Sequence, residues 1–165
     1  MRRLIAVASC LVALAVTAGA AAATKRIVKP AKQVNIACTT SVGVMVAEGD
    51  TGVAPPVAQG TEYGTAHCSG GIGNGVQRDL FRIPESGNTL ANVIWYFHGG
   101  SISGKYELTP QEGSFNFLQA DSTGKLTVTG GSGAYRGVKG AGTIVCHTDD
   151  GIHTRCINRL KVKLG

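Results

Sequence analysis

Residues 125–143, KLTVTGGSGAYRGVKGAGT, decide the fold class of this chain. Leu126, Val128 and Gly130 alternate with polar neighbours, which is the period-two pattern of a half-buried β-strand. A compact turn rich in glycine follows, and the chain then continues into a second strand at 143–148. Two strands joined by a short turn form a hairpin, so this segment predicts an all-β architecture.

The remaining sequence carries the same signal. Short alternating runs are separated by glycine, proline or polar clusters, and no helical period of useful length follows residue 23. Short strands at regular spacing are typical of a sandwich or a closed barrel. A turn is expected at 121–124, and 42–47 forms either a second strand or the continuation of the first. The strands are expected at 34–39, 42–47, 60–68, 76–83, 91–98, 102–108, 114–119 and 152–164.

The first 23 residues predict a secretory signal peptide. Arg2 and Arg3 supply the positive start, residues 4–16 are apolar, and small residues suited to cleavage follow. A membrane anchor is the alternative, but the apolar stretch is short for a bilayer span. We therefore expect export to the extracellular space or the cell envelope.

Beyond the leader, the sequence predicts a basic flexible arm at 24–32 and a single β-barrel domain at 33–165. The formal net charge is +6, and all ten acidic residues lie between Glu48 and Asp150. The basic ends could contact an anionic polymer or surface, or they could be solvated tails and strand faces. Four Phe, four Tyr and one Trp offer little material for base stacking, so no nucleic-acid partner is expected.

Four cysteines follow the leader, an even number that in an exported chain predicts two disulfides. Cys146 and Cys156 flank the turn at 149–151, so antiparallel strands would bring them face to face. That pairing leaves Cys38 with Cys68.

Other chemistries were weighed at these positions. A zinc site from Cys146, His147, His153 and Cys156 is disfavoured, because adjacent strand residues project to opposite faces. The glycines around Ser132 lead into a strand rather than a helix, which disfavours a phosphate-binding loop. They also lack the pattern of a nucleophile elbow. We therefore predict no metal and no cofactor.

The stretch 126–137, LTVTGGSGAYRG, strongly resembles the allene oxide cyclase barrel family, and plant dirigent proteins share the same strand, glycine turn and following strand. A looser resemblance covers 60–164, and the leader suggests a secreted, bacterial-type member. The resemblance implies a small antiparallel β-barrel of calycin-like type, often oligomeric, with an apolar interior open at one end. It also implies chemistry without metal or redox cofactor, in which a reactive lipid or phenoxy radical is held while it cyclises or couples.

The hairpin turn residues receive structural roles. We expect the first three glycines of the turn to adopt positive φ, Tyr135 to pack over the barrel end, and the later glycines to permit close approach at a bend. These residues are Gly130, Gly131, Gly133, Tyr135, Gly137, Gly140 and Gly142.

Glu62 is the one weak catalytic candidate. It shares a strand face with Gly64, Ala66 and Cys68, whose small side chains would leave room for a ligand, and burial would raise its pKa. The alternative is an exposed glutamate at a strand end.

Trp95, Tyr96, His98 and Tyr106 are the candidates for lining a ligand cavity. The alternative places Tyr96 and His98 outside while Trp95 and Phe97 fill the core, and makes Tyr106 an ordinary core residue. The alternation along 91–98 places Trp95 and Tyr96 on opposite faces of the strand in both arrangements, so it does not decide which face is inward.

The sequence thus supports two functional hypotheses. The first is a secreted barrel that binds a small apolar or phenolic molecule, with a cofactor-free cyclase, isomerase or coupling-steering activity. The second is a non-catalytic extracellular interaction protein with a filled barrel and basic ends. An inward carboxylate favours the first, and an interior packed by Trp95, Phe97, Phe115 and Phe117 favours the second.

Overall fold

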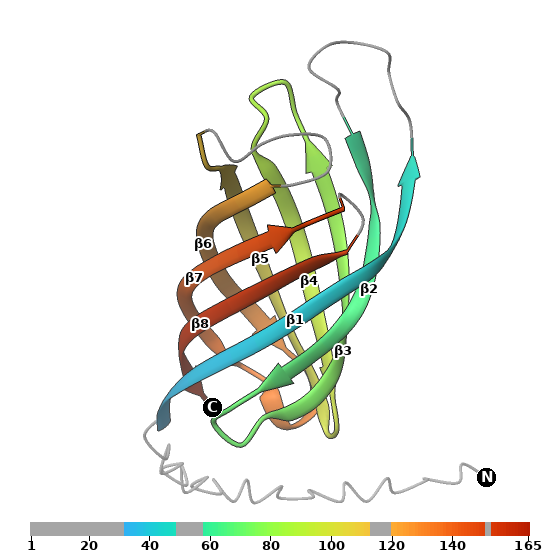
Figure 1. Ribbon diagram of the computed structural model, residues 1–165. Helices are drawn as coiled ribbons and strands as arrows, with labels where there is room; N and C mark the ends of the chain where they lie inside the picture. Colours follow the sequence, from blue (N-terminus) through green and yellow to red (C-terminus); the bar gives the residue numbers. More distant parts are fainter. Residues whose placement is uncertain (1–31, 49–57, 113–119, 151–152) are drawn as a thin grey trace, which may run out of the picture.

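The computed structural model describes residues 32–48, 58–112, 120–150 and 153–165, which form a closed antiparallel β-barrel (Figure 1). Each strand pairs with the next along the chain, and the last strand pairs with the first. The expected all-β barrel is therefore confirmed. Its strands are β1 (Lys32–Glu48), β2 (Ala58–Cys68), β3 (Gly73–Ile83), β4 (Thr89–Phe97), β5 (Gly100–Pro110), β6 (Ala120–Gly131), β7 (Lys139–Thr148) and β8 (Thr154–Leu164).

The strands are inclined to the barrel axis, as Figure 1 shows. Starting at Val34 in β1 and following paired residues through β8, β7 and onward to β2, the path returns to β1 at Met45. This stagger is what tilts the strands of a closed sheet, and an eight-stranded barrel has an interior that side chains or one small ligand can fill.

Alternation along each strand separates the interior from the surface. In β4, Val93 and Trp95 are buried while Asn92 and Tyr96 are exposed. In β8, the inward face includes Leu160 and Val162, as expected. One period-two pattern therefore supplies both a dry interior and a solvated exterior.

The β2–β3, β4–β5 and β6–β7 turns lie at the lower end of the barrel in Figure 1, and buried apolar side chains close this end. Ile72, Phe97 and Val138 are buried where the β2–β3, β4–β5 and β6–β7 turns meet. The rings of Phe97 and Tyr135 meet edge to face, with centroids 5.9 Å apart. The expectation that Tyr135 packs over the barrel end is confirmed.

The glycine turn matches the prediction in part. Gly133 has a φ of 55° and Gly137 a φ of 80°, whereas Gly130 and Gly131 lie in β6 without positive φ. The prediction of positive φ is wrong for those two. Gly131 is needed for a different reason, because a Cβ there would lie 2.5 Å from the carbonyl oxygen of Tyr135.

The later glycines permit close strand approach where β7 meets β8. A Cβ on Gly140 would lie 2.4 Å from the carbonyl oxygen of Lys161, and one on Gly142 would lie 1.8 Å from that of Arg159. The expectation of close approach is confirmed at these two positions. Gly137 instead has open space beside it, and its requirement is the backbone angle.

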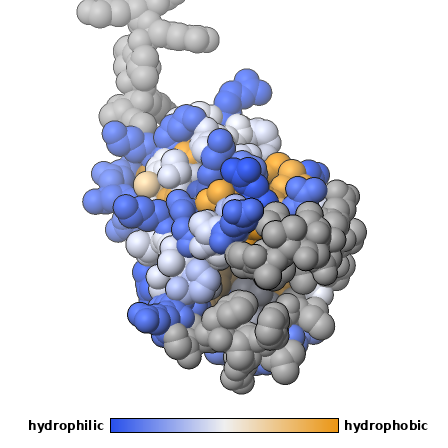
Figure 2. Space-filling view, turned by 90° about the horizontal axis from the view of Figure 1, so that it is seen from above, coloured by the Kyte–Doolittle hydropathy of each residue, from blue (hydrophilic) through white to orange (hydrophobic). Residues whose placement is uncertain are grey.

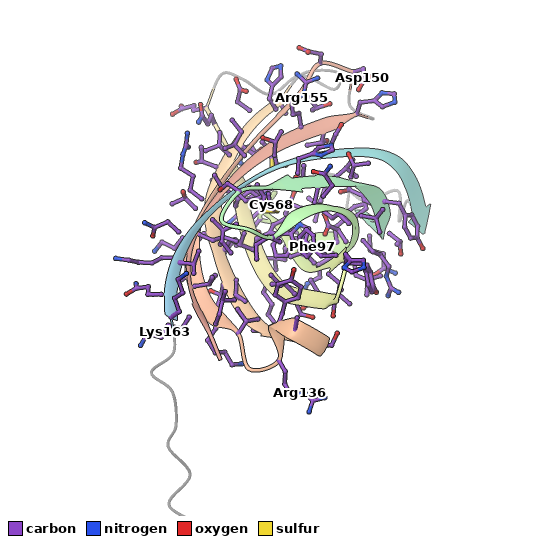
Figure 3. All side chains as sticks on the ribbon, turned by 90° about the horizontal axis from the view of Figure 1, so that it is seen from below. Cys68, Phe97, Arg136, Asp150, Arg155 and Lys163 are labelled. Carbon is purple, nitrogen blue, oxygen red and sulfur yellow. A yellow bond between two sulfur atoms is a disulfide. The ribbon has the colours of Figure 1, made fainter. Side chains whose placement is uncertain are left out.

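Both predicted disulfides are present, Cys38–Cys68 and Cys146–Cys156. Each joins directly opposed residues of neighbouring strands, with Cα atoms 4.0 and 4.1 Å apart. Figure 3, seen from below, places Cys68 and Phe97 within the ring of strands. The two bridges fasten β1 to β2 and β7 to β8, on either side of the pairing between β1 and β8 that closes the barrel.

Several strand limits differ from the expectation. Residues 42–47 continue β1, and β7 begins at Lys139 rather than 143. The turn expected at 121–124 is wrong, since these residues belong to β6: all four pair with β7, and 122–124 also pair with β5. Pairing on both sides outweighs the local turn preference of Asp, Ser and Gly.

Some predictions fall outside the described residues. These are the leader, almost all of the basic arm, and the strand expected at 114–119 together with Phe115 and Phe117. Within the described part of the chain, no helix has the length and apolar character needed to cross a membrane.

Replacing Gly133 with alanine tests the turn geometry. A Cβ at this position would lie 2.1 Å from the carbonyl oxygen of Gly99, and the φ of 55° already disfavours an L residue. We expect a loss of about 1–3 kcal/mol in the free energy of unfolding, measured by urea titration. Gly130→Ala is the matched control, because open space surrounds its Cβ position and it should change stability far less. Equal losses in the two variants would contradict the assignment.

Removing each disulfide by paired Cys→Ala substitution tests how closure is secured. The bridges span sequence separations of 30 and 10 residues. On the loop-entropy model, loss of Cys38–Cys68 should cost roughly 3.6 kcal/mol and loss of Cys146–Cys156 roughly 2.7 kcal/mol. Urea unfolding of both variants measures the difference, and a larger loss for the shorter loop would argue against the entropic origin.

Candidate functional site

Strand β3 carries two polar side chains into the barrel. Its inward face presents Gln77, Asp79 and Phe81, with Gln77 and Asp79 only 5% and 1% exposed. Burying a carboxyl group is costly unless it is hydrogen-bonded or protonated. Asp79 therefore needs hydrogen-bond donors from neighbouring strands or a proton of its own.

A chain of hydrogen bonds holds Asp79 in place. The Trp95 indole Nε1–H donates to Gln77 Oε1 over 2.7 Å, and Gln77 Nε2 donates to Asp79 Oδ2 over 2.5 Å. The Tyr106 hydroxyl donates to the same Asp79 Oδ2 over 3.1 Å. Because an indole can only donate, Trp95 determines which way the Gln77 amide faces. Strands β3, β4 and β5 thus jointly orient one carboxyl group.

The second oxygen of this carboxyl group has no hydrogen-bond partner among the residues that the structure describes. Asp79 Oδ1 is buried and accepts no hydrogen bond from the described part of the chain. An unmet buried acceptor costs about 1–3 kcal/mol, so such atoms are rare and call for an explanation. A hydroxyl group of a bound molecule is a partner that would satisfy it.

Glu62 lies directly opposite Asp79 in the β2–β3 ladder and is half-buried. Burial raises the pKa of Glu62 above its usual range. Burial, and then the charge of Glu62, raise the pKa of Asp79 to about 7, against the lowering effect of its bonds from Gln77 and Tyr106. Burial also raises the pKa of the Tyr106 hydroxyl. Near neutral pH, Asp79 can therefore both donate and accept a proton.

The interior contains a second polar pair. Asn158 of β8 and Thr40 of β1 are each 1% exposed, and Asn158 Nδ2 lies 3.5 Å from Thr40 Oγ1. Asn158 Oδ1 is the other buried acceptor without a partner among the described residues. Asp79 Oδ1 of β3 and Asn158 Oδ1 of β8 are thus both buried acceptors that receive no hydrogen bond from the described residues.

The structure brings together three of the predicted site residues. Glu62, Trp95 and Tyr106 all face inward at or beside Asp79. Tyr96 and His98 require a correction, because both are exposed and lie outside this cluster. Since neighbouring strand residues face opposite ways, burial of Trp95 and Phe97 places Tyr96 on the exterior.

Sequence reasoning missed Asp79 and Gln77. In 76–83 one alternating set reads Gln, Asp, Phe, Ile and the other reads Val, Arg, Leu, Arg. Each set is half apolar, so neither marks the inner face. Folding 60–68 against 76–83 around the expected turn at 69–75 sets Glu62 opposite Arg82, whereas the turn in the structure is only 69–72 and sets Glu62 opposite Asp79. The sequence therefore carries no usable signal for this pairing.

Two grooves lie on the outer surface of the barrel. One of about 720 Å³ crosses β2 to β6 and is lined by side chains such as Leu80, Arg82, Asn92 and Lys105. Another, of about 450 Å³, lies over β1, β8 and β7. Seen from above in Figure 2, the described surface is mainly hydrophilic, with hydrophobic residues in small groups. No group of His, Cys, Asp and Glu side chains in the described ranges is arranged to hold a metal ion.

Comparison with known proteins bears on the fold. No family model and no curated protein matches this sequence. The solved structure of a pterocarpan synthase dirigent protein matches with a TM-score of 0.61 at 12% identity, over 84% of this chain and 88% of that one. The barrel is dirigent-like. This agrees with the dirigent half of the resemblance, and the allene oxide cyclase and bacterial-type expectations gain no support from it.

The raised pKa of Asp79 has a consequence for stability of this dirigent-like barrel. The Asp79 carboxyl group has a pKa near 3.8 in the unfolded chain and about 7 in the folded chain, so the folded state binds the proton more tightly. The stability that this proton contributes is complete below pH 3.8 and is lost as the pH rises towards 7. Between them, the free energy of unfolding should fall by up to about 4 kcal/mol.

Asp79→Asn tests this directly, because asparagine keeps an oxygen for both donors but carries no charge. Urea unfolding at several pH values between 4 and 8 should show that the variant gains stability relative to wild type as the pH rises. A constant difference across this range would contradict an Asp79 pKa raised by burial.

Proposed function

We propose that this barrel binds a small phenolic molecule in its interior, with the phenol hydroxyl donating to Asp79 Oδ1. The supporting observation is the buried, partnerless oxygen of a carboxyl group whose other oxygen already accepts two hydrogen bonds. A ligand hydroxyl offers one donor on a flat apolar ring, which suits a single unmet acceptor in an apolar interior.

The side chains around Asp79 suit an aromatic guest. Phe81 lies two residues along the same strand face, and Val93 is paired with Asp79 across β4. A Cβ on Gly104, which is paired with Val93, would lie 3.3 Å from the Val93 side chain and 3.4 Å from that of Leu126, so this glycine lets the apolar walls approach each other. Asp79 therefore stands among apolar neighbours.

We further propose that Asp79 and Glu62 move protons during a cofactor-free rearrangement. The ionised carboxylate accepts the phenol proton while the phenol oxygen forms a bond to one carbon of a double bond in the same ligand. The π bond of that double bond breaks, and the protonated acid returns the proton to its other carbon. No electron is gained or lost overall, so cyclisation or isomerisation fits and oxidation does not. A pKa near the working pH suits a group that must do both.

The fold likeness is consistent with this proposal. The matched protein is named a pterocarpan synthase and a dirigent protein, and a dirigent-like barrel fits a binding or steering role for phenolic molecules. The two disulfides are consistent with export to an oxidising compartment, as the predicted leader suggests. Assembly into a homo-oligomer remains part of the proposal.

Fluorescence of Trp95 provides the test, since it is the single tryptophan and is hydrogen-bonded to Gln77. A panel of alkyl-substituted methoxyphenols should change its emission, and the corresponding methyl ethers, which lack the hydroxyl donor, should bind about tenfold more weakly or worse. Asp79→Asn should reduce phenol affinity by a similar factor.

Two tyrosines give a matched control pair. Tyr106→Phe removes a donor to Asp79 and should weaken phenol binding, whereas Tyr96→Phe alters an exposed side chain and should not. Equal affinity of phenols and ethers, or of wild type and Asp79→Asn, would contradict the proposed site.

A further inference from the structure

A row of cations lies along the outer face of β8. Arg159, Lys161 and Lys163 occupy alternate positions, and all three side chains are exposed. Alternate residues of an antiparallel strand are roughly 7 Å apart, so the charges form a straight, evenly spaced line. Figure 3 shows Lys163 projecting outward from the ring of strands.

Short uncharged side chains flank Arg159 and Lys161 on both sides, whereas Lys163 lies between Gln33 of β1 and Lys139 of β7. Arg159 lies between Ala37 of β1 and Thr143 of β7 in the ladders. Lys161 is flanked by Asn35 and Ala141 in the same way. Because these flanking side chains are short, a groove of about 450 Å³ lies over β1, β8 and β7, and Arg159 and Lys161 help to line it.

Among the described residues, no carboxylate forms an ion pair with this row. The described outward-facing side chains of β1, β7 and β8 include no Asp or Glu, and the ion pairs among described residues involve only His147 and His153. Asp149 and Asp150, at the β7–β8 turn, contact those histidines. The cations therefore keep an uncompensated positive field at one end of the face.

We propose that this face binds a linear acidic polysaccharide lengthwise along β8. Carboxylate or sulfate groups repeated along the polymer would pair with the regularly spaced cations. Asn35 and Thr143 supply an amide and a hydroxyl for sugar hydroxyl groups, and the groove accepts a narrow chain. Val145 and Ile157, an exposed pair directly opposite each other next to Arg159, offer an apolar contact for a sugar ring.

The same face is poorly suited to other anionic partners. Its described outward residues include no Phe, Tyr or Trp, so bases of a nucleic acid would find nothing to stack on. Val145 and Ile157 are its exposed apolar pair, and its described outward residues include none of the Trp, Phe or Leu side chains that typically insert into a lipid surface. The concave form and hydrogen-bonding flanks favour the polysaccharide.

The test measures binding of the exported chain without its leader to sodium polygalacturonate, with neutral dextran as the uncharged comparison. Polygalacturonate should bind, binding should weaken as salt is added, and dextran should not bind. The triple variant Arg159→Gln, Lys161→Gln, Lys163→Gln should lose affinity by about tenfold or more.

The chain offers a control with the same change in charge. Arg78→Gln, Arg82→Gln and Lys105→Gln remove three outer cations from β3 and β5. This control should retain affinity within about threefold. Equal losses in the two triple variants would show attraction to net charge alone and would overturn the proposal.

Two further arms separate the other partners. A single-stranded oligonucleotide and vesicles containing phosphatidylserine should each bind more weakly than polygalacturonate at the same salt concentration. Stronger binding of either one would overturn the polysaccharide assignment. Thermal unfolding confirms that both triple variants are folded, and Lys161→Gln alone provides a milder substitution in which a loss of affinity is still expected.

Discussion

Closure of the sheet by pairing between β1 and β8 is the constraint on which the rest of this structure depends. An open eight-stranded sheet would leave two rows of unpaired backbone groups and an apolar face in contact with water. Pairing the first strand with the last removes both edges and makes the apolar face an interior. The disulfides on either side of this seam limit how far its strands can separate in the unfolded chain.

Closure also creates the unusual environment of Asp79. Once the sheet is closed, every inward polar group must find a partner within the barrel or remain unmet. The bonds from Gln77 and Tyr106 satisfy one oxygen of Asp79, and Glu62 opposite makes ionisation of the group harder. A stability cost is thus concentrated at one carboxyl group, as is often found where a protein acts on a ligand.

The two faces of the sheet serve different chemistry. The inner face combines apolar walls with a few oriented polar groups, which suits a small ring-shaped molecule. The outer face of β8 presents a line of charge between low flanks, which suits an extended polymer. Alternation along a single strand supplies both, since Asn158 and Leu160 face inward while Arg159 and Lys161 face outward.

Much of the fold could be predicted from residues close together in the chain. Alternation at 91–98 and 152–164, the glycine hairpin and the cysteines flanking a turn each depend on local spacing. The structure confirms them over the residues it describes, except for the positive φ expected at Gly130 and Gly131. The turn expected at 121–124 was wrong because its residues are held by strands on both sides. Which face of 76–83 is buried, and that Asp79 meets Glu62, Tyr106 and Gln77, depended on register between strands. Register is set by packing and closure of the whole barrel, so only the tertiary structure decided where the acid lies and that Tyr96 and His98 lie apart from it.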